Sequence, residues 1–516
     1  MVLRMPIRKI SSEYRTPQTP TYIIWSDKNG TYYAKNTYTG ELTSSQNVAH
    51  LIKSAAEIIK SKYSGGKIFL KSGQYVISEA VDLGEGDLNL VIEGEDMWST
   101  VLTLQSDIPV FRAVATRPNS GVRMLTVRNL TIRGSGQGQG IVLGATQRGV
   151  LQFAALVTIE KVFFDRLKQA IYANNLWIGK IIDVVTNSGV PGGPPVIQFD
   201  ENGADTSHDI YIVRLYAEGF KSRLISLPPR SYDITIDQAF IDAHNEADYL
   251  IYMDPSSHYN AVLNSYLAGA TRYAVHASPG SKIKGNLIWY TARGVYGMGA
   301  IIEGNNFTEI SEEAVHLSVP VEPPNIVKEN SIMNAKYGVI SETDHAVIET
   351  NRLYNIAKQA IIVRYRTGNI IRGNAIYVVG GPSVIEITGQ YHIIADNHIN
   401  SELSTYAVDE PDGDNNVIDR NMIISPVNIR KTGPNTYIGN NHRYITRNSG
   451  RMVIPTNSRS ATVNHRLACT PQKILVTPLA QPPGPIWVSN INNTSFQINV
   501  STAPTADLPV AWYAEC

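Results

Sequence analysis

The sequence is poor in charge, in cysteine and in long apolar runs. Only 17% of its 516 residues are charged, and 45 basic residues balance 45 acidic ones. A formal net charge of zero argues against a dedicated nucleic-acid-binding protein, because such proteins carry a basic excess. We therefore expect no nucleic-acid partner.

No apolar run approaches the roughly 20 residues that a membrane-spanning helix needs, so we expect no membrane insertion. The first twenty residues are basic and then polar, without the apolar centre of a signal peptide. If the protein acts outside the cell, we expect it to leave by another route, such as release inside a virus particle.

The two cysteines, Cys469 and Cys516, form no metal-binding or redox motif. Two free buried thiols and a disulfide that closes a small terminal domain both remain open. The eleven histidines include no pair at helical metal-ligand spacing, so we expect no metal and no cofactor.

What the sequence does contain is a repeat. The pattern apolar-x-x-Asn-x-apolar recurs between residues 280 and 445 at a mean period of about 22 residues, which is typical of a solenoid. The repeated asparagines are Asn286, Asn305, Asn330, Asn351, Asn374, Asn397 and Asn421. Each unit reads as two short Ile/Val-rich strands with a bend between them and carries no helical periodicity, which favours one coil of a parallel β-helix.

In such a stack, like residues lie above one another. The asparagines are therefore expected to form a structural hydrogen-bonded ladder at the bend, where asparagine also tolerates left-handed backbone. Right-handed winding follows from the preference for right-handed crossovers between parallel strands.

The two ends of the chain differ from the repeat. Residues 47–63 place apolar side chains on one helical face, with Ser44 or Ser45 as the expected N-cap and Gly65-Gly66 at the end. After residue 448, five segments that alternate in period two are separated by Pro- and Asn-rich turns, which predicts a small antiparallel β-sandwich.

These elements divide the chain into four parts. Residues 1–43 are an arm and a β-hairpin, and 44–84 are a capping helix with the first strands. Residues 85–448 are a parallel β-helix of about 14 coils, and 449–516 are the β-sandwich. The predicted fold class is all-β.

The helix, the following segment Gly65-Gly-Lys-Ile-Phe-Leu-Lys-Ser-Gly-Gln-Tyr75 and the Ile-x-x-Asn coils together resemble the pectin-lyase-like right-handed β-helix superfamily. Residues 22–41 are similar to β-helix proteins of archaea and their viruses. The terminal module resembles those of viral tail fibres and spikes, which bind receptors or hold trimers together.

The resemblance implies a virion tailspike-like adhesin that binds a glycan or glycoprotein on the host cell surface. Residues 1–43 would dock it to other tail proteins, it would form a homotrimer, and it would lie on the virion surface or outside the cell. The alternative is a polysaccharide-degrading hydrolase or lyase on the same fold. The linear motifs of polygalacturonase-like and pectate-lyase-like enzymes are missing, which disfavours that alternative.

Two acidic groups are candidates for catalysis if the protein is an enzyme. Asp242, Glu246 and Asp248, with His244, share one face if their segment is extended, and a carboxylate pair can cleave a glycosidic bond. Asp200 and Glu201 follow a Pro/Gly-rich insertion at 191–195 that could wall a groove.

Aromatic residues are the stronger signal for a glycan. Tyrosine outnumbers phenylalanine by 27 to 10, and an aromatic cluster lies between residues 249 and 296. Its predicted glycan-binding members are Tyr249, Tyr252, Tyr259, Tyr266, Tyr273, Trp289 and Tyr290. Each ring combines an apolar face with a hydrogen-bonding group, which suits sugars.

Overall fold

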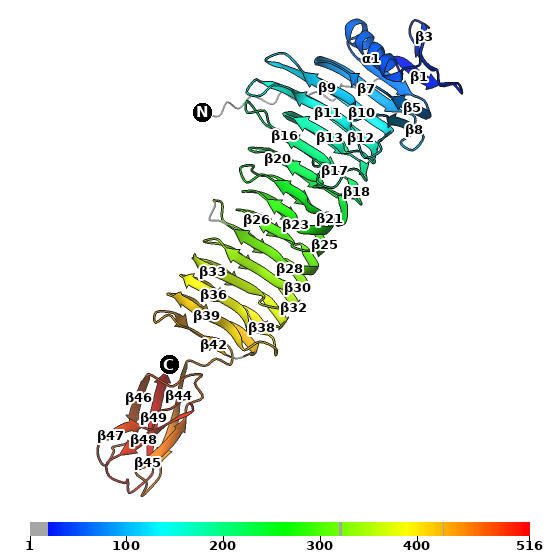
Figure 1. Cartoon of the computed structure of the whole chain (residues 1–516). Helices are drawn as coiled ribbons and strands as arrows, with labels where there is room; N and C mark the ends of the chain where they lie inside the picture. Colours follow the sequence, from blue (N-terminus) through cyan, green and yellow to red (C-terminus); the bar gives the residue numbers. More distant parts are fainter. Residues whose placement is uncertain (1–18, 319–321, 427) are drawn as a thin grey trace. The chain divides into compact units, whose positions relative to one another are not determined.

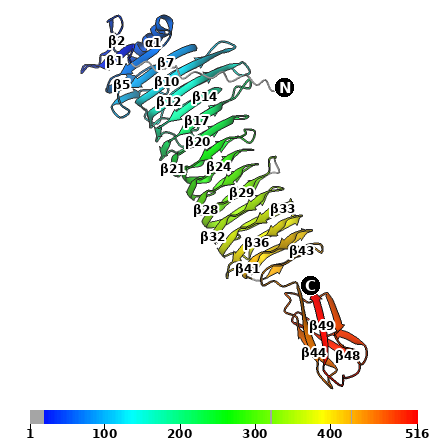
Figure 2. The same cartoon turned by 180° about the vertical axis from the view of Figure 1, so that it is seen from behind.

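The computed structural model describes residues 19–318, 322–426 and 428–516 (Figures 1 and 2). The first eighteen residues of the predicted docking arm lie outside the described residues. The chain divides into two compact units, up to Asn325 and from Ile326 onward, and each is nearly all β.

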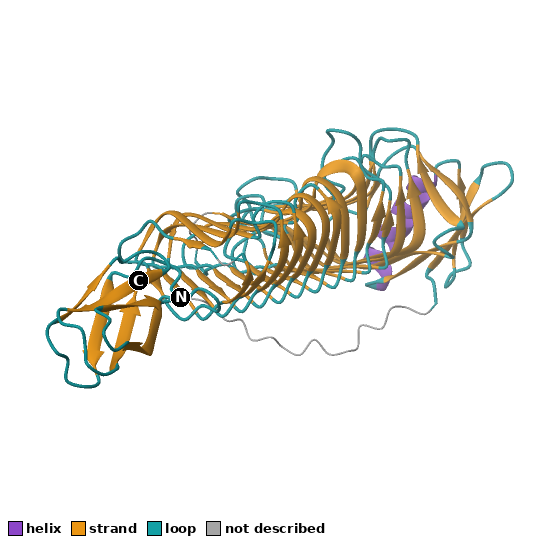
Figure 3. Cartoon of the chain, turned by 90° about the horizontal axis from the view of Figure 1, so that it is seen from below, coloured by secondary structure: helices purple, strands orange, loops and turns teal. Residues whose placement is uncertain are grey.

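The first unit begins with a cap. Its elements are β1 Tyr22–Ser26, β2 Tyr32–Asn36, β3 Leu42–Ser45 and α1 Val48–Ile58, continued by a π-helical turn over Ile59–Tyr63. The apolar face of α1 packs against these strands and the first coil (Figure 3). The N-cap is Asn47, not Ser44 or Ser45, because the Asn47 side chain accepts hydrogen bonds from the backbone N–H groups of Ala49 and His50.

The stacked coils of the first unit form three parallel β-sheets, because each coil contributes strands that pair with those of the next coil. The first sheet contains β4 Gly66–Leu70, β7 Gly86–Gly94, β10 Ser120–Arg133, β12 Gln152–Asp165, β14 Leu176–Ile182, β17 His208–Val213, β20 Tyr232–Asp237, β22 Ala261–Leu263, β24 Lys282–Lys284 and β27 Ile301–Glu303.

The second sheet contains β5 Gly73–Ile77, β8 Thr100–Leu104, the ends of β10 and β12, β15 Val185–Thr186, β18 Tyr216–Glu218, and the starts of β21 Phe240–Met253, β23 Tyr266–Ala277, β25 Leu287–Thr291 and β28 Asn306–Ser318. The third contains β6 Val81–Asp82, β9 Pro109–Ala115, β11 Gln139–Ala145, β13 Gln169–Asn174, β16 Ile197–Asp200, β19 Ile225–Leu227, the ends of β21, β23 and β28, and β26 Val295–Gly297.

The coil stack therefore starts at β4, upstream of the boundary expected at residue 85. Strand β1 already pairs in parallel with β4 through Tyr22 and Ile68, so residues 22–45 belong to the folded cap.

The second unit continues the same coil pattern. Its first sheet contains β29 Ile326–Lys328, β31 Val347–Glu349, β34 Ile370–Arg372, β37 Ile393–Ala395, β40 Val417–Asp419 and β43 Tyr437–Ile438. Its second sheet contains the start of β30 Ser331–Glu342, β32 Arg352–Ile356, β35 Ala375–Val379, β38 His398–Asn400 and β41 Met422–Ser425. Its third sheet contains the end of β30, β33 Ile361–Thr367, β36 Ser383–Gln390, β39 Tyr406–Asp414 and β42 Ile429–Arg430.

Within each unit, inward side chains at like positions form the core. Ile348, Ile371, Ile394 and Ile418 are register partners on successive coils and are fully buried, whereas Val347, Ile370, Ile393 and Val417 beside them are partly exposed. Alternation in period two thus buries every second residue and leaves the others for the surface.

The predicted asparagine ladder is present. In the second unit each ladder asparagine donates its side-chain amide to the next one at 2.8–3.0 Å, from Asn330 to Asn441. In the first unit Asn286 donates to Asn305 in the same way at 2.9 Å. The described ladder asparagines are buried, so the shared amides satisfy groups that water cannot reach.

The left-handed residue at this bend is the one before the ladder asparagine, which corrects the expectation for the bend. Gly285, Glu329, Thr350, Gly373 and Asp396 have φ between 55° and 69°. The asparagine itself keeps ordinary backbone because its side chain must point inward, along the stack, to reach its neighbour.

The chain ends in two antiparallel three-stranded sheets. They contain β44 Arg447–Ile454, β49 Leu508–Glu515 and β46 Lys473–Pro478 in one sheet, and β45 Ser460–Asn464, β48 Ser495–Val500 and β47 Ile486–Ser489 in the other. Phe496, Ile498, Val510 and Trp512 fill the core between the sheets. Cys469 and Cys516 form a disulfide, with Cα atoms 5.7 Å apart.

Candidate functional site

An outward-facing column of rings crosses the second sheet of the first unit. Tyr216, Phe240 and Tyr266 are register partners on β18, β21 and β23, and neighbouring rings stack with centroids 4.9 and 4.6 Å apart. Trp289 on β25 follows Tyr266 at 6.3 Å. We call these four residues the aromatic ladder. Alternation turns their side chains away from the core, and Tyr216 and Trp289 are 42% and 40% exposed.

Tyr290 extends the ladder at a strained position. Its φ is 49° and its side chain is 56% exposed. The corresponding place in the preceding coil belongs to Gly269, which follows Ala268, the register partner of Trp289. A bulky residue with positive φ is uncommon and costs about 1–3 kcal/mol. In this left-handed conformation the Tyr290 ring lies on the surface beside Trp289, with ring centroids 5.7 Å apart.

The other predicted aromatics divide by exposure. Tyr259 is 67% exposed, whereas Tyr252 is half-buried. Tyr249 and Tyr273 are buried, with guanidinium groups over their rings: Arg223 lies 4.9 Å from the Tyr249 ring and Arg293 lies 5.5 Å from the Tyr273 ring. Burial is the physical reason why the expectation that Tyr249 and Tyr273 present a face to a glycan is wrong.

A carboxylate–imidazole cluster lies at the side of the aromatic ladder. His244 Nε2 lies 3.4 Å from Glu218 and 3.8 Å from Asp242, which are register partners on β18 and β21. The Tyr216 hydroxyl donates to Glu218 at 2.5 Å, and this hydrogen bond raises the pKa of Tyr216. Tyr216, Glu218 and His244 line a cavity of about 310 Å³.

Glu246 and Asp248 do not join this cluster, which corrects the expectation of one shared face. His244 and Asn245 have φ of 50° and 63°, so β21 breaks its alternation there. The break leaves Asp242 with the His244 cluster, and its carboxylate accepts the His244 N–H at 2.9 Å. A bend in left-handed conformation cannot be read from alternation alone.

Glu246 and Asp248 line a second cavity of about 490 Å³. The predicted insertion contributes Gly192, Gly193 and Pro195 to its wall. Each carboxylate faces a cation: Glu246 lies 3.4 Å from Lys221, and Asp248 lies 3.2 Å from Arg223. These ion pairs neutralise the cavity and leave no unpaired carboxylate pair in it.

Asp200 and Glu201 lie apart from both cavities. Asp200 accepts the Tyr172 hydroxyl at 3.1 Å, and burial together with this carboxylate raises the pKa of Tyr172 to about 12. Glu201 pairs with Arg230 at 2.6 Å. Both carboxylates are therefore engaged in contacts within the protein. The insertion at 191–195 forms a wall of the Glu246 cavity and not of a groove beside Asp200 and Glu201.

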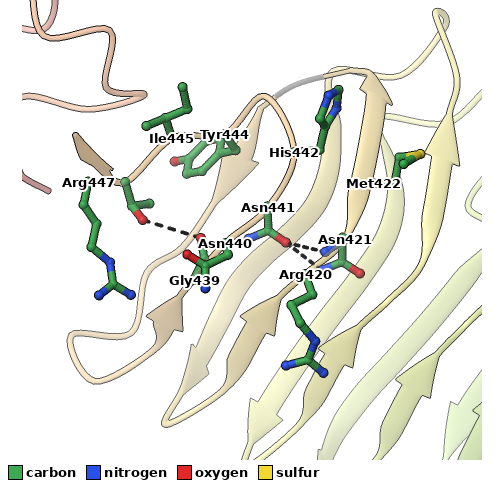
Figure 4. A pocket seen from close by; sticks show the side chains of 11 residues that line it. Arg420, Asn421, Met422, Gly439, Asn440, Asn441, His442, Tyr444, Ile445 and Arg447 are labelled. Carbon is green, nitrogen blue, oxygen red and sulfur yellow. Dashed lines mark hydrogen bonds between the residues drawn. The ribbon is translucent and has the colours of Figure 1, made fainter. Parts of the chain in front are cut away.

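A third cavity, of about 460 Å³, lies at the end of the asparagine ladder (Figure 4). Figure 4 shows Asn421 and Asn441 pointing toward each other, and Asn441 Oδ1 accepts both the backbone and the side-chain N–H of Asn421. The polar groups at its floor are therefore already paired with each other.

Sequence reasoning missed Tyr216, Glu218 and Phe240. A usable signal existed, because Tyr216, Phe240 and Tyr266 lie 24 and 26 residues apart, close to one coil. An aromatic residue that recurs at the coil period predicts a stack as directly as the asparagines do.

The family model described as periplasmic copper-binding protein (NosD) matches residues 256–454. These residues lie in the stacked coils and the start of β44. This match covers less than half of the chain, whose fold is a right-handed parallel β-helix. No curated protein has a sequence that matches this β-helix protein significantly.

Solved structures that resemble the β-helix protein include enzymes and phage proteins. The A-module of a mannuronan C-5 epimerase from Azotobacter vinelandii is 14% identical, with 77% of this chain and 95% of that chain covered and a TM-score of 0.41. A tailspike mutant of E. coli bacteriophage HK620, in complex with a pentasaccharide, is 11% identical, with 91% and 90% covered and a TM-score of 0.43. ORF18 of Geobacillus virus E2 is 10% identical, with 92% and 84% covered and a TM-score of 0.39. Similarity at this level says nothing about ligand or activity.

The described residues of the β-helix protein provide no copper centre. Within residues 19–318, 322–426 and 428–516, no group of three or more His, Cys, Asp or Glu side chains could hold a metal ion, and both cysteines are engaged in the disulfide. No helix in these ranges is long and apolar enough to cross a membrane.

Proposed function

We propose that this chain is an attachment protein that binds a cell-surface glycan along the aromatic ladder. One observation carries the proposal: Tyr216, Phe240 and Tyr266 form a continuous outward stack, and the tilted ring of Trp289 and the exposed, strained Tyr290 follow at its end. Aromatic rings that have no core to fill, on a rigid sheet, suit the apolar faces of sugar rings.

The polar groups beside the ladder suit the sugar hydroxyls. Glu218 and Asp242 supply acceptors and His244 supplies a ring nitrogen, all within one coil spacing of the rings. Oligosaccharide and polysaccharide ligands also occur in the names of the solved structures above, but the proposal does not rest on them.

On this proposal the protein acts on the surface of a virion or outside the cell. It does so as a homotrimer, and its N-terminal part docks to tail proteins. The resemblance of the terminal module to tail-fibre modules supports it. Three copies would convert weak sites into tight attachment through effective concentration. Light scattering of the purified chain tests the trimer, and mass spectrometry of purified particles tests the location.

The test of glycan binding is a pull-down of the purified chain on host envelope polysaccharide. Trp289→Ala combined with Tyr290→Ala should weaken binding at least about tenfold, because a central aromatic contact contributes more than about 1 kcal/mol. Trp98→Ala and Tyr211→Ala are matched controls, since these rings are 63% and 53% exposed and lie outside the ladder. Equal binding by the double variant and the two controls would refute the ladder site.

A second candidate function is polysaccharide modification at the His244 cluster. The specific observation is that Glu218, Asp242 and His244 converge beside the rings that would hold a sugar chain. A carboxylate and an imidazole within hydrogen-bonding reach can move a proton at a sugar carbon or glycosidic oxygen. Release of reducing or unsaturated ends, or a changed monosaccharide composition, that His244→Ala and Glu218→Gln abolish would establish the enzyme.

A further inference from the structure

The outer face of the sheet β45-β48-β47 differs from every surface discussed above. Alternation buries Phe496, Ile498 and Val500 between the two sheets and turns their neighbours on β48 outward. The outward residues of the three strands are Ser460, Thr462, Asn464, Trp487, Ser489, Ser495, Gln497 and Asn499.

Trp487 is the one large apolar side chain of this outward set. It is 49% exposed on β47, and its register partner is Asn499, which in turn faces Ser460 on β45. A tryptophan at an outward strand position gains little from folding, since half of its surface remains in water. Its position indicates a ring available for contact.

The amides around Trp487 are held in place by one another. Asn499 Nδ2 donates to Ser489 Oγ at 2.8 Å, and Gln497 Nε2 donates to Ser460 Oγ at 2.9 Å. Asn490 Nδ2 donates to Gln497 Oε1 at 2.8 Å. These bonds fix the direction of amide and hydroxyl groups before any ligand arrives, which lowers the entropy cost of binding.

The three strands contain no Asp, Glu, Lys or Arg. The other sheet of the module is charged, because Arg447, Glu515 and Lys473 form one row across it. Leu475 lies beside them and is 54% exposed. An uncharged array of donors and acceptors around a ring complements a ligand that has hydroxyl groups and no charge.

We propose that this face binds a neutral oligosaccharide, with the Trp487 ring against one sugar ring and the amides of Gln497 and Asn499 toward its hydroxyls. The site is separate from the aromatic ladder and does not depend on it. Each sugar contributes an apolar C–H face to the indole and a rim of hydroxyls to the amides. Such a site would give the terminal module its own contribution to attachment.

Affinity electrophoresis of the full chain tests the proposal. The probes are soluble neutral polysaccharides (a glucan, a mannan and a galactan), with polygalacturonate as the charged counterpart. We expect at least one neutral probe to retard the chain, and Trp487→Ala to weaken that retardation about tenfold. Leu475→Ala, a matched change on the other sheet, should bind like the wild type.

Two further variants guard against a folding artefact. Trp487→Phe keeps a ring and should recover part of the affinity, whereas Asn499→Asp keeps the shape and should weaken binding by about fivefold. The melting temperature of each variant is measured alongside. No retardation by any neutral probe, or retardation equal in wild type and Trp487→Ala, would overturn the proposal. So would a dimer or trimer that Trp487→Ala dissociates without any glycan binding, because the face would then be a protein interface.

Loss of binding in Trp487→Ala with normal binding in the Trp289/Tyr290 double variant would separate the two sites. The reverse result would leave the aromatic ladder as a glycan site and reject this one.

Discussion

Asn397 Oδ1 accepts two hydrogen bonds from Asn374, one from its backbone N–H and one from its side-chain amide, each at 3.0 Å. The residues are 23 positions apart and lie on successive coils. One buried oxygen thus holds two coils in register. The same double contact joins Asn351 to Asn374 and Asn397 to Asn421.

This relationship predicts a large cost for breaking one step of the ladder. Asn397→Ala leaves the buried backbone N–H of Asn374 without its acceptor and removes one of the three acceptors of the Asn374 side-chain amide. An unsatisfied buried group costs about 1–3 kcal/mol. We expect a clearly lower melting temperature by circular dichroism. Asn440→Ala changes an exposed asparagine next to the ladder and should have little effect. Equal melting temperatures for the two variants would contradict a stabilising ladder.

Tyr290 predicts an unusual separation of stability from binding. Tyr290→Gly removes a bulky residue from left-handed backbone, so the free energy of unfolding should stay the same or rise by up to about 1 kcal/mol while glycan binding falls. Tyr354→Gly, an exposed tyrosine inside β32, is the control and should destabilise the protein, because glycine weakens a strand. Destabilisation by Tyr290→Gly of the same size would show that its ring serves packing.

His392 predicts acid sensitivity. Burial holds the pKa of His392 below its usual value and outweighs the opposing effects of the Thr388 and Arg366 carbonyls and of Glu410 and Asp344. His392 Nδ1 accepts the backbone N–H of Asn369 at 3.1 Å, so the native ring is neutral.

The unfolded chain takes up a proton at His392 as pH falls through about 6.5, and the native state does not. Stability is therefore complete above this pH and is lost below it, by up to about 1.4 kcal/mol per pH unit from this group. Chemical denaturation between pH 5 and 7.5 measures it. His392→Asn should reduce the change of the free energy of unfolding with pH. His50→Asn, on the exposed side of α1, is the control and should leave that change as in the wild type. Equal slopes for wild type and His392→Asn would refute the role of His392.

The disulfide predicts a selective loss in the terminal module. Cys469 and Cys516 close a loop with a sequence separation of 47, for which chain entropy gives about 4 kcal/mol of stabilisation. Cys469→Ser with Cys516→Ser should make residues from 447 onward sensitive to protease at a lower temperature than the coils. Timed proteolysis with mass spectrometry measures this. Unchanged cleavage of the module would mean that its core alone, around Phe496 and Trp512, is sufficient.

The solenoid could be predicted because its signal is local and repeated. Each ladder asparagine has an isoleucine, valine or leucine at fixed distance on most coils, and the helix and the terminal strands have their own periodicities. The candidate site was predicted less well. Trp289 and Tyr290 are exposed at the ladder and Tyr266 is half-buried there. Tyr249 and Tyr273 are buried under arginines that alternation does not reveal.

The sequence by itself determined the coil, its mean length and the asparagine that marks its bend, because side-chain alternation and the spacing of the asparagines can be read along the chain. Only the tertiary structure decided which residues of neighbouring coils meet. Glu218 lies beside Asp242 and His244 because of the register between β18 and β21. Glu246 lies away from them because the backbone at His244 and Asn245 is left-handed. Register depends on the length and corner conformation of every coil, and these are settled by packing between turns.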